Sequence, residues 1–251
     1  MSNTGFKSIK NRAPAIYFAL VSLLVGMVPA LAKAQDYVTA GTAYSLNSNQ
    51  VLYRELYTGI DENKSVRVDY VSPEGKTFAT KTLVYSGELF QPMFNFEDTR
   101  DNEFASAQFE GARLMLTQGA KGHQSQKAIL DNAKIVIDAG FDAYIQLHWD
   151  KLMEGKRLKF EFALVNRLTT VQLEVRKIRA SESPVYDDDI GSDWVYFRIT
   201  PAKKIASLFA DPINLAYNPN GKYLMRYHGR SNLDDNNGDP VDVRIEYEYL
   251  N

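Results

Sequence analysis

Residues 140–155 read GFDAYIQLHWDKLMEG and give the clearest amphipathic helix pattern in a sequence that otherwise alternates like β-strands. Apolar residues recur at helical spacing along this stretch, so that four of them share one stripe while polar residues fall on the other sides. A glycine after the last apolar position is typical of a helix end. The pattern therefore predicts one long helix over residues 140–154, with a packed stripe of Phe141, Ile145, Trp149 and Leu152.

Outside this stretch the dominant period is two, which is typical of strands with one packed and one solvated face. Residues 64–71, 158–164 and 241–249 alternate apolar and polar side chains in this way. Turn sequences with proline and glycine separate such runs at residues 72–75 and 218–221, because proline presets φ and glycine accepts a positive φ. Connections this short join only antiparallel strands.

The expected fold is mainly β. A twisted sheet of many strands tends to curl or close, so we expect a single curved antiparallel sheet or open half-barrel of about ten strands, covered by the long helix. Thr200 and Pro201 have the residue types of an N-cap and a first helical position, and predict a short second helix at about 201–209. Residues 91–101 are acidic and irregular, and predict a loop or a single helical turn.

The first residues have the three parts of a secretory signal peptide. Three basic residues within the first twelve precede an uncharged apolar run at 13–28, and residues 32–34 read Ala-Lys-Ala, a small-x-small cleavage pattern. The apolar run is too short for a comfortable membrane span. We therefore expect a cleavable signal peptide at 1–34, cleavage after Ala34, and a single β-rich domain at 35–251 in the periplasm. An uncleaved N-terminal anchor is the alternative.

The composition excludes several kinds of site. The chain has no cysteine, which rules out zinc–thiolate sites, iron–sulfur clusters, cysteine nucleophiles and disulfides. Removing the four basic residues of the signal peptide from 29 leaves 25 basic against 31 acidic residues, a net charge of −6. That sign disfavours nucleic-acid binding, which depends on neutralising phosphates. We expect no transmembrane segment in the mature protein, because no other apolar run approaches spanning length.

No catalytic motif is present in the sequence. The histidines His123, His148 and His228 are tens of residues apart and lack metal-ligand spacing. The sequence has no nucleophile elbow, P-loop or dinucleotide fingerprint. His228 and Ser231 lie three residues apart, which is a weak catalytic pair because no third group is positioned beside them. We therefore assign no catalytic, cofactor-binding or metal-binding residues, and expect a protein that is not an enzyme and has no cofactor.

Two acidic loops are more typical of turns than of metal sites. Residues 234–239 read DDNNGD, and no register of this segment places glycine and the acidic ligands at calcium-loop positions. Its Asn-Gly pair suits a hairpin turn. The three consecutive aspartates Asp187, Asp188 and Asp189 predict a solvated loop, and a weak hard-cation site is the minor alternative.

Two blocks in the second half of the chain resemble a known group of proteins. The first is residues 140–155 with the strand at 158–162; the second runs from Asp211-Pro212-Ile213 through Arg226-Tyr227 and Ser231-Asn232 to Val243-Arg244-Ile245. These blocks resemble a group of uncharacterised exported β-rich proteins of Gram-negative bacteria, a domain of unknown function. The resemblance implies a periplasmic address and a mostly antiparallel β fold, and it implies no activity. A looser architectural analogy is the half-barrel of periplasmic lipoprotein carriers, where helices cover a curved sheet.

Three functional hypotheses follow. Export, the lack of a catalytic motif and the aromatic-rich strands favour a non-enzymatic periplasmic protein that binds an apolar or amphipathic ligand such as a lipid. The alternative is an envelope interaction or scaffold protein with a fully packed core and no ligand. A hydrolase with an unrecognised site is less favoured, and it needs residues such as His148, His228 and Ser231 to converge in one cleft. The helix at 140–154 separates the first two: it is a plug if its stripe fills the sheet, and a lid if it stands off.

Overall fold

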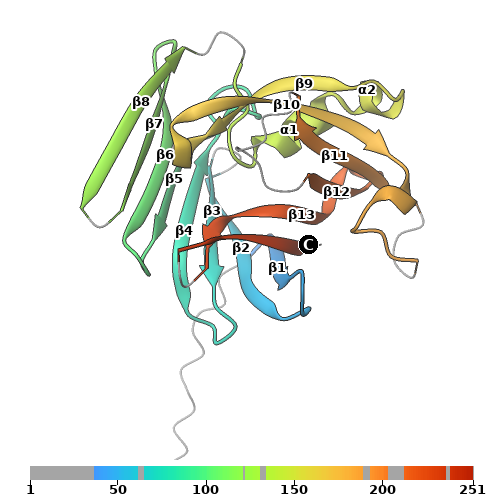
Figure 1. Ribbon diagram of the computed structural model, residues 1–251, viewed down its shortest axis with the longest axis horizontal. Helices are drawn as coiled ribbons and strands as arrows, with labels where there is room; N and C mark the ends of the chain where they lie inside the picture. The colour runs from blue at the N-terminus through green and yellow to red at the C-terminus, as the bar shows by residue number, and fades with distance from the viewer. Residues whose placement is uncertain are drawn as a thin grey trace, which may run out of the picture. The chain divides into compact units, whose positions relative to one another are not determined.

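The computed structural model describes residues 37–61, 65–120, 122–130, 134–188, 193–202, 212–235 and 238–250, which belong to one compact unit, Gln35–Asn251. The expected signal peptide lies outside the described residues. Fourteen strands of this part of the chain form a single open antiparallel sheet (Figure 1). The strands are β1 (Thr39–Ser45), β2 (Val51–Asp61), β3 (Ser65–Val71), β4 (Thr77–Val84), β5 (Met93–Asp98), β6 (Glu103–Glu110), β7 (Arg113–Ala120), β8 (His123–Leu130), β9 (Leu158–Leu164), β10 (Thr169–Ile178), β11 (Val195–Pro201), β12 (Ile213–Asn218), β13 (Tyr223–Asp234) and β14 (Pro240–Tyr249).

Two strands that are consecutive in the sequence, β8 and β9, lie at opposite edges of the sheet. Strands β1 to β8 follow one another as neighbours, and so do β9 to β14. The two runs join where β1 pairs with β14, with Ala43 opposite Ile245. The two edges are therefore β8 and β9, which are consecutive in the sequence and are connected by residues 131–157. A closed barrel would pair β8 with β9, whereas this sheet stays open.

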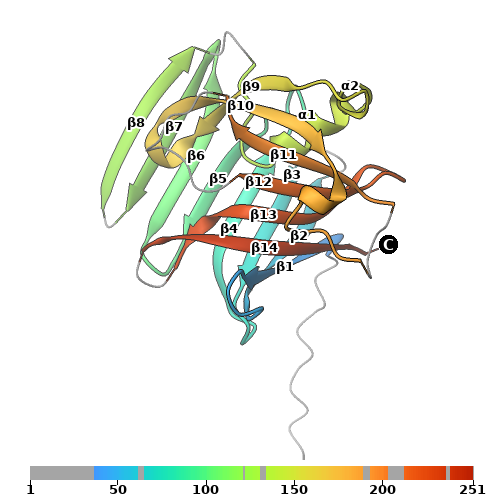
Figure 2. The same cartoon turned by 45° about the vertical axis from the view of Figure 1, so that its right-hand side comes forward.

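The sheet nevertheless curls back toward itself. The 3₁₀ turn η1 (Val165–Arg167), which joins β9 to β10, lies against β6 and β7. Both views show this end of β10 close to β6 and β7 (Figures 1 and 2). The right-handed twist of adjacent strands produces such curling once many strands are joined. The sheet therefore has an inner face, on which the core of the protein lies.

Residues 134–139, which we call the strap, cover the outer edge of β9. Val136 forms an isolated parallel bridge to this strand. Its amide donates to the carbonyl oxygen of Glu161 at 2.8 Å, and its carbonyl oxygen accepts from the amide of Ala163 at 2.9 Å. The strap therefore takes the place of a neighbouring strand over part of β9.

The expected long helix is instead two short helices. α1 spans Gly140–Leu147 and α2 spans Trp149–Met153. His148 separates them, because its φ of −105° and ψ of 16° lie outside the helical region. The predicted stop is confirmed: α2 ends before Gly155, which has a φ of +83°.

The strand count and two local predictions are also corrected. The sheet has fourteen strands where about ten were expected. The loop predicted at 91–101 is wrong, because β5 forms there with alternating buried and exposed side chains. Of its two acidic residues, Glu97 is exposed, whereas Asp98 is buried and lies 2.6 Å from Nη2 of Arg100. Thr200 and Pro201 belong to β11 and open no helix, and residues 203–209 of the expected short helix lie outside the described residues.

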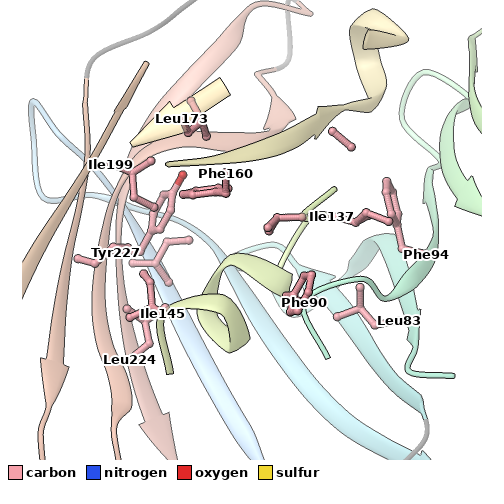
Figure 3. Packing of buried hydrophobic residues seen from close by; sticks show 14 of the residues in the cluster. Leu83, Phe90, Phe94, Ile137, Ile145, Phe160, Leu173, Ile199, Leu224 and Tyr227 are labelled. Atoms are coloured by element: carbon pink, nitrogen blue, oxygen red, sulfur yellow. The ribbon is translucent and has the colours of Figure 1, made fainter. Parts of the chain in front are cut away.

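The core lies between the inner face of the sheet and the connection from β8 to β9. Figure 3 shows α1 within the curve of the sheet, with Ile145 beside Leu224 and Tyr227. Ile137 of the strap lies in the same cluster, between Phe160 and Phe94. None of the described helices has the length and apolar character needed to cross a bilayer.

Candidate functional site

The predicted apolar stripe packs against the inner face of the sheet. Ile145, Trp149 and Leu152 are 1%, 6% and 0% exposed. The indole ring of Trp149 meets the rings of Phe197 and Tyr217 edge to face, with centroids 5.3 and 5.6 Å apart. The break at the end of α1 therefore leaves the stripe intact, since members from both helices reach the core.

The start of α1 sits directly on the chain between β4 and β5. The amide of Ile137 donates to the carbonyl oxygen of Phe90 at 3.1 Å. Gly140 begins the helix in contact with the same backbone, and a Cβ at this position would overlap the carbonyl oxygen of Phe90. Phe141 is half-buried and its ring lies 6.3 Å from that of Tyr227. The sequence needs glycine at this helix start because of the close approach, not because of an unusual φ.

A carboxylate on α1 joins the helix to the sheet. Oδ1 of Asp142 accepts a hydrogen bond from the hydroxyl of Tyr217 at 2.8 Å, and Oδ2 accepts one from Nε2 of Gln146 at 2.9 Å. Burial raises the pKa of Asp142 to about 6, and the two hydrogen bonds limit that rise. They do so because they stabilise the ionised form.

A second carboxylate holds the strap. Lys81 on β4 is 4% exposed, and its Nζ lies 2.7 Å from Oδ1 of Asp138. Burial by itself would lower the pKa of Lys81, but the charge of Asp138 and the neighbouring Tyr70 and Glu55 raise it above its ordinary value. Asp138 has a φ of +45°, a left-handed conformation that non-glycine residues adopt at some energetic cost. The ion pair therefore fixes a strained residue at the point where the strap enters α1.

Glu55 on β2 lies in the same interior. It is 6% exposed, and its Oε2 accepts hydrogen bonds from the hydroxyls of Tyr57 at 2.6 Å and Tyr247 at 3.3 Å. Burial raises the pKa of Glu55, while Lys81 and the two hydroxyls oppose that rise. Burial also raises the pKa of the surrounding tyrosines, which stay neutral and donate hydrogen bonds: Tyr53, Tyr57, Tyr70, Tyr227 and Tyr247.

Further polar groups of the same interior are also paired, and together with Glu55, Lys81 and their partners we call them the interior cluster. The hydroxyl of Tyr53 lies 2.8 Å from Oγ of Ser231, and Nδ2 of Asn232 donates to the hydroxyl of Tyr70 at 3.3 Å. Buried polar groups that are paired in this way hold a single arrangement, because any other leaves one of them unpaired. The cluster therefore fixes the strap and α1 on the sheet.

The residues weighed for catalysis do not converge. His123 lies on β8, His148 between the two helices, and His228 on β13. His228 pairs in register with Asn214, whereas Ser231 contacts Tyr53 in the core, so the two lie on opposite faces of the sheet. Among the residues that the structure describes, no group of three histidine, aspartate or glutamate side chains is placed to hold a metal ion.

The aspartates of the two acidic segments make different contacts. The segment at 234–239 connects the paired strands β13 and β14, and Asn236 and Asn237 within it lie outside the described residues. The amide of Gly238 donates to the carbonyl oxygen of Asp235 at 3.0 Å, which agrees with the predicted hairpin turn. Asp187 lies 3.8 Å from Nη2 of Arg226, and Asp188 accepts a hydrogen bond from the hydroxyl of Tyr186 at 2.6 Å. Asp189 lies outside the described residues.

The sequence analysis missed the interior ionisable groups, although a signal for two of them is present. Glu55 shares a strand face with Tyr53 and Tyr57, and Lys81 shares one with Ala79 and Leu83. A charged residue at an inward position of an alternating strand indicates a buried partner. Nothing local indicates that the partner of Lys81 is Asp138, 57 residues further along the chain.

No family model matches the chain, and no curated protein matches it. Among solved structures, it is similar to a β-barrel-like protein of the domain of unknown function DUF1849 from Brucella abortus, with 9% sequence identity and a TM-score of 0.42 over 86% of this chain and 99% of that chain. That match is to a β-rich protein of unknown function from a Gram-negative bacterium, which is the kind of protein that the two sequence blocks resemble. A likeness this distant carries no functional argument.

Proposed function

We propose that this chain is a non-enzymatic protein of the cell envelope that acts as an interaction or scaffold module with a filled interior. The observation that carries the proposal is the burial of Ile145, Trp149 and Leu152 on the inner face of the sheet. A lipid carrier would need space at that place. The periplasmic address remains an expectation from the signal-peptide pattern at 1–34.

The polar contacts of the connection support the same proposal. An acyl chain could replace apolar side chains on the sheet at little cost, but it cannot replace the ion pair of Lys81 with Asp138 or the hydrogen bond from Tyr217 to Asp142. Separating a buried ion pair leaves charges without partners, which is strongly unfavourable. These contacts therefore favour a helix that stays on the sheet as a plug.

Binding of an apolar ligand beneath α1 is the second candidate function. The aromatic residues of the inner face, among them Phe160 and Tyr227, would suit such a ligand. The ligand would have to replace the burial of three large apolar side chains, each of which contributes about 1.5–3 kcal/mol. This candidate therefore requires a large apolar ligand and a displaced α1.

A fluorescent fatty acid distinguishes the two candidates. Delipidated and refolded wild-type protein should show no saturable uptake of cis-parinaric acid. Trp149→Ala should gain uptake, because it opens an apolar cavity, at a cost of about 3–5 kcal/mol in unfolding free energy. Tyr223→Ala removes an aromatic ring that is 47% exposed and should behave like the wild type. Saturable one-to-one uptake by the wild-type protein would contradict the plug and select the lipid-binding candidate.

A further inference from the structure

Exposed apolar side chains gather at one corner of the molecule, which we call the apolar corner. Nine large hydrophobic side chains of the described residues are exposed. Five of them lie where β1 and β13 begin and where β14 and α1 end: Val38, Leu147, Tyr223, Tyr249 and Leu250. Soluble proteins seldom expose several such side chains side by side unless that surface contacts a partner or a membrane.

The strand ends join four of these residues into one surface. The ring of Tyr223 lies 4.7 Å from the ring of Tyr249, centroid to centroid. Leu250 follows Tyr249 in the sequence, and its amide donates to the carbonyl oxygen of Val38 at 3.0 Å. The four side chains are between 38% and 50% exposed, so they lie beside one another and still face solvent.

The end of α1 brings Leu147 to the same corner. Nε2 of Gln146 donates to the carbonyl oxygen of Lys222 at 3.3 Å, and Lys222 directly precedes Tyr223. Leu147 is 63% exposed, more than any other large hydrophobic side chain in the described part of the chain. It lies two positions after the buried Ile145, so the helix turns it away from the core. The corner therefore combines three strand ends with one helix end.

The corner is too small and too weakly charged for a stable protein interface. The residues that flank its members in the sequence carry one positive charge, on Lys222, and one negative charge, on Glu248. Five partly exposed side chains present roughly a few hundred Å² of apolar surface, whereas a stable interface buries about 800 Å² on each partner. Binding to a lipid surface has no such minimum, because it scales with the apolar area that enters the bilayer.

The position of the corner along the chain favours the same partner. The described residues begin at 37, next to Val38. Nine residues, 29–37, separate this point from the uncharged apolar run at 13–28. At about 3.3–3.6 Å per residue, these residues span about 30 Å at most. An apolar run of this kind enters membranes during export, and the corner then lies within that distance of the bilayer.

From these features we propose that the apolar corner docks on the surface of a phospholipid bilayer. The aliphatic side chains of Val38, Leu147 and Leu250 enter the boundary of the hydrocarbon region. The two tyrosine rings lie at the level of the headgroups, where aromatic residues with a polar tip are enriched. The proposal goes beyond the scaffold function and does not rest on it, since the corner lies outside the interior cluster.

Flotation with lipid vesicles tests the proposal on residues 35–251, the compact unit that contains all the described residues. This chain lacks the apolar run, so any binding comes from the folded domain. It should float with vesicles of phosphatidylethanolamine and phosphatidylglycerol. It should do so at low and at high salt, because salt screens charges and not apolar contacts. No flotation, or flotation that high salt abolishes, would overturn the proposal.

Matched leucine variants locate the docking surface. Leu147→Gln/Leu250→Gln should lower the ratio of bound to free protein by about tenfold or more, because both side chains lose their apolar contact with the lipid. The control is Leu46→Gln/Leu89→Gln. Leu46 lies beyond the opposite end of β1 and Leu89 lies between β4 and β5, and they are 40% and 61% exposed. The control should change the ratio by less than about twofold, and an equal change in both double variants would overturn the proposal.

A tryptophan at the corner gives a second readout. The emission of Tyr223→Trp should shift to shorter wavelength when vesicles are added, because the indole ring leaves water. Leu46→Trp carries the same probe beyond the other end of β1 and should show no shift. A shift in both variants, or in neither, would contradict docking through this corner.

Analytical ultracentrifugation tests whether a second copy of the chain covers the corner instead. The wild-type domain should sediment as a monomer, since the corner is smaller than a stable dimer interface. A dimer that Leu147→Gln/Leu250→Gln dissociates would assign the corner to self-association and overturn the lipid proposal.

Discussion

The two edges of the sheet differ in their exposure to solvent, because the edge at β9 is covered and the edge at β8 is not. The edge of β9 carries the strap, and two of its backbone groups pair with Val136. In the described part of the chain β8 pairs only with β7, and its side chains from Gln124 to Ala128 are exposed. Strand β9 contributes Phe160 and Ala163 to the core. Unpaired backbone groups on β9 would therefore be away from water, whereas water can satisfy those on β8.

The comparison shows that an edge is covered where it borders the core. Both edges belong to the same connection, since residues 131–157 begin after β8 and end at β9. The chain could have paired β8 with β9 and closed the sheet. Instead the connection contributes the strap to one edge and two helices to the inner face. The only charged side chain on the uncovered strand is Lys127, and lysine on an edge strand disfavours pairing with another chain.

The largest expected effect comes from breaking the covered edge. Val136→Pro removes the amide that donates to Glu161 and disturbs a side chain that is 0% exposed. The unfolding free energy should fall by about 4 kcal/mol or more, which combines an unpaired buried carbonyl with lost packing. Denaturant unfolding followed by circular dichroism measures the loss.

Val136→Ala is the matched control for this variant. It keeps the backbone amide and should cost only about 2 kcal/mol, from the smaller side chain. If the proline variant were no less stable than the alanine variant, the bridge to β9 would contribute nothing and the covered edge would be no different from the uncovered one.

A smaller effect is expected from the carboxylate that ties α1 to the sheet. The pKa of Asp142 in the folded protein, about 6, lies above its ordinary value of 3.8, so the folded state holds this proton more tightly than the unfolded state. The stability that protonation provides is present below about pH 4 and is lost as the pH rises through 6. Asp142→Asn lacks this titration. Its stability relative to the wild type should therefore rise by about 2 kcal/mol between pH 4 and pH 7.5, after allowance for partial exposure.

Thermal or denaturant unfolding at several pH values checks this expectation. A constant difference between Asp142→Asn and the wild type from pH 4 to pH 7.5 would mean that folding does not raise the pKa of this carboxyl group, which would contradict its burial between α1 and the sheet.

Much of the fold could be predicted because its signals are local. The alternation at 158–164, the hairpin turn at 218–221 and the stop at Gly155 each depend on neighbouring residues, and the structure confirms them. The break at His148 has no such signal. Its amide is shared between the carbonyl oxygens of Tyr144 and Ile145, 3.2 Å from each, so the helical hydrogen-bond pattern is disrupted where the sequence still favours a helix.

The remaining features depend on residues far apart in the chain. Pairing of β1 with β14 joins the two ends of the domain, and no local pattern specifies it. Strand β5 was missed because its buried Asp98 looks like a loop residue until Arg100 is seen beside it. The alternation along β2 predicts the inward position of Glu55, but nothing local predicts its partner Tyr247, which lies on β14. Local periodicity therefore predicts which faces are buried, and long-range pairing decides which charges can be buried there.

The smallest effects are expected on the uncovered edge. β8 pairs with β7 along its whole length without a bulge, and Gln126 lies opposite Thr117. In an antiparallel pair the amides of consecutive residues point alternately toward the partner and away from it. Of the variants Gln126→Pro and Lys127→Pro, one loses a hydrogen bond to β7 and the other loses none, so the milder variant should cost less than about 1 kcal/mol.

The harsher of these two variants should still cost less than Val136→Pro when unfolding is measured under the same conditions. The side chains at both positions are exposed, so a displaced backbone group on β8 can pair with water, whereas the carbonyl of Glu161 beneath the strap cannot do so as readily. If both β8 variants destabilised the protein as much as Val136→Pro, the β8 edge would have to be covered as β9 is. The two edges would then not differ in their exposure to solvent.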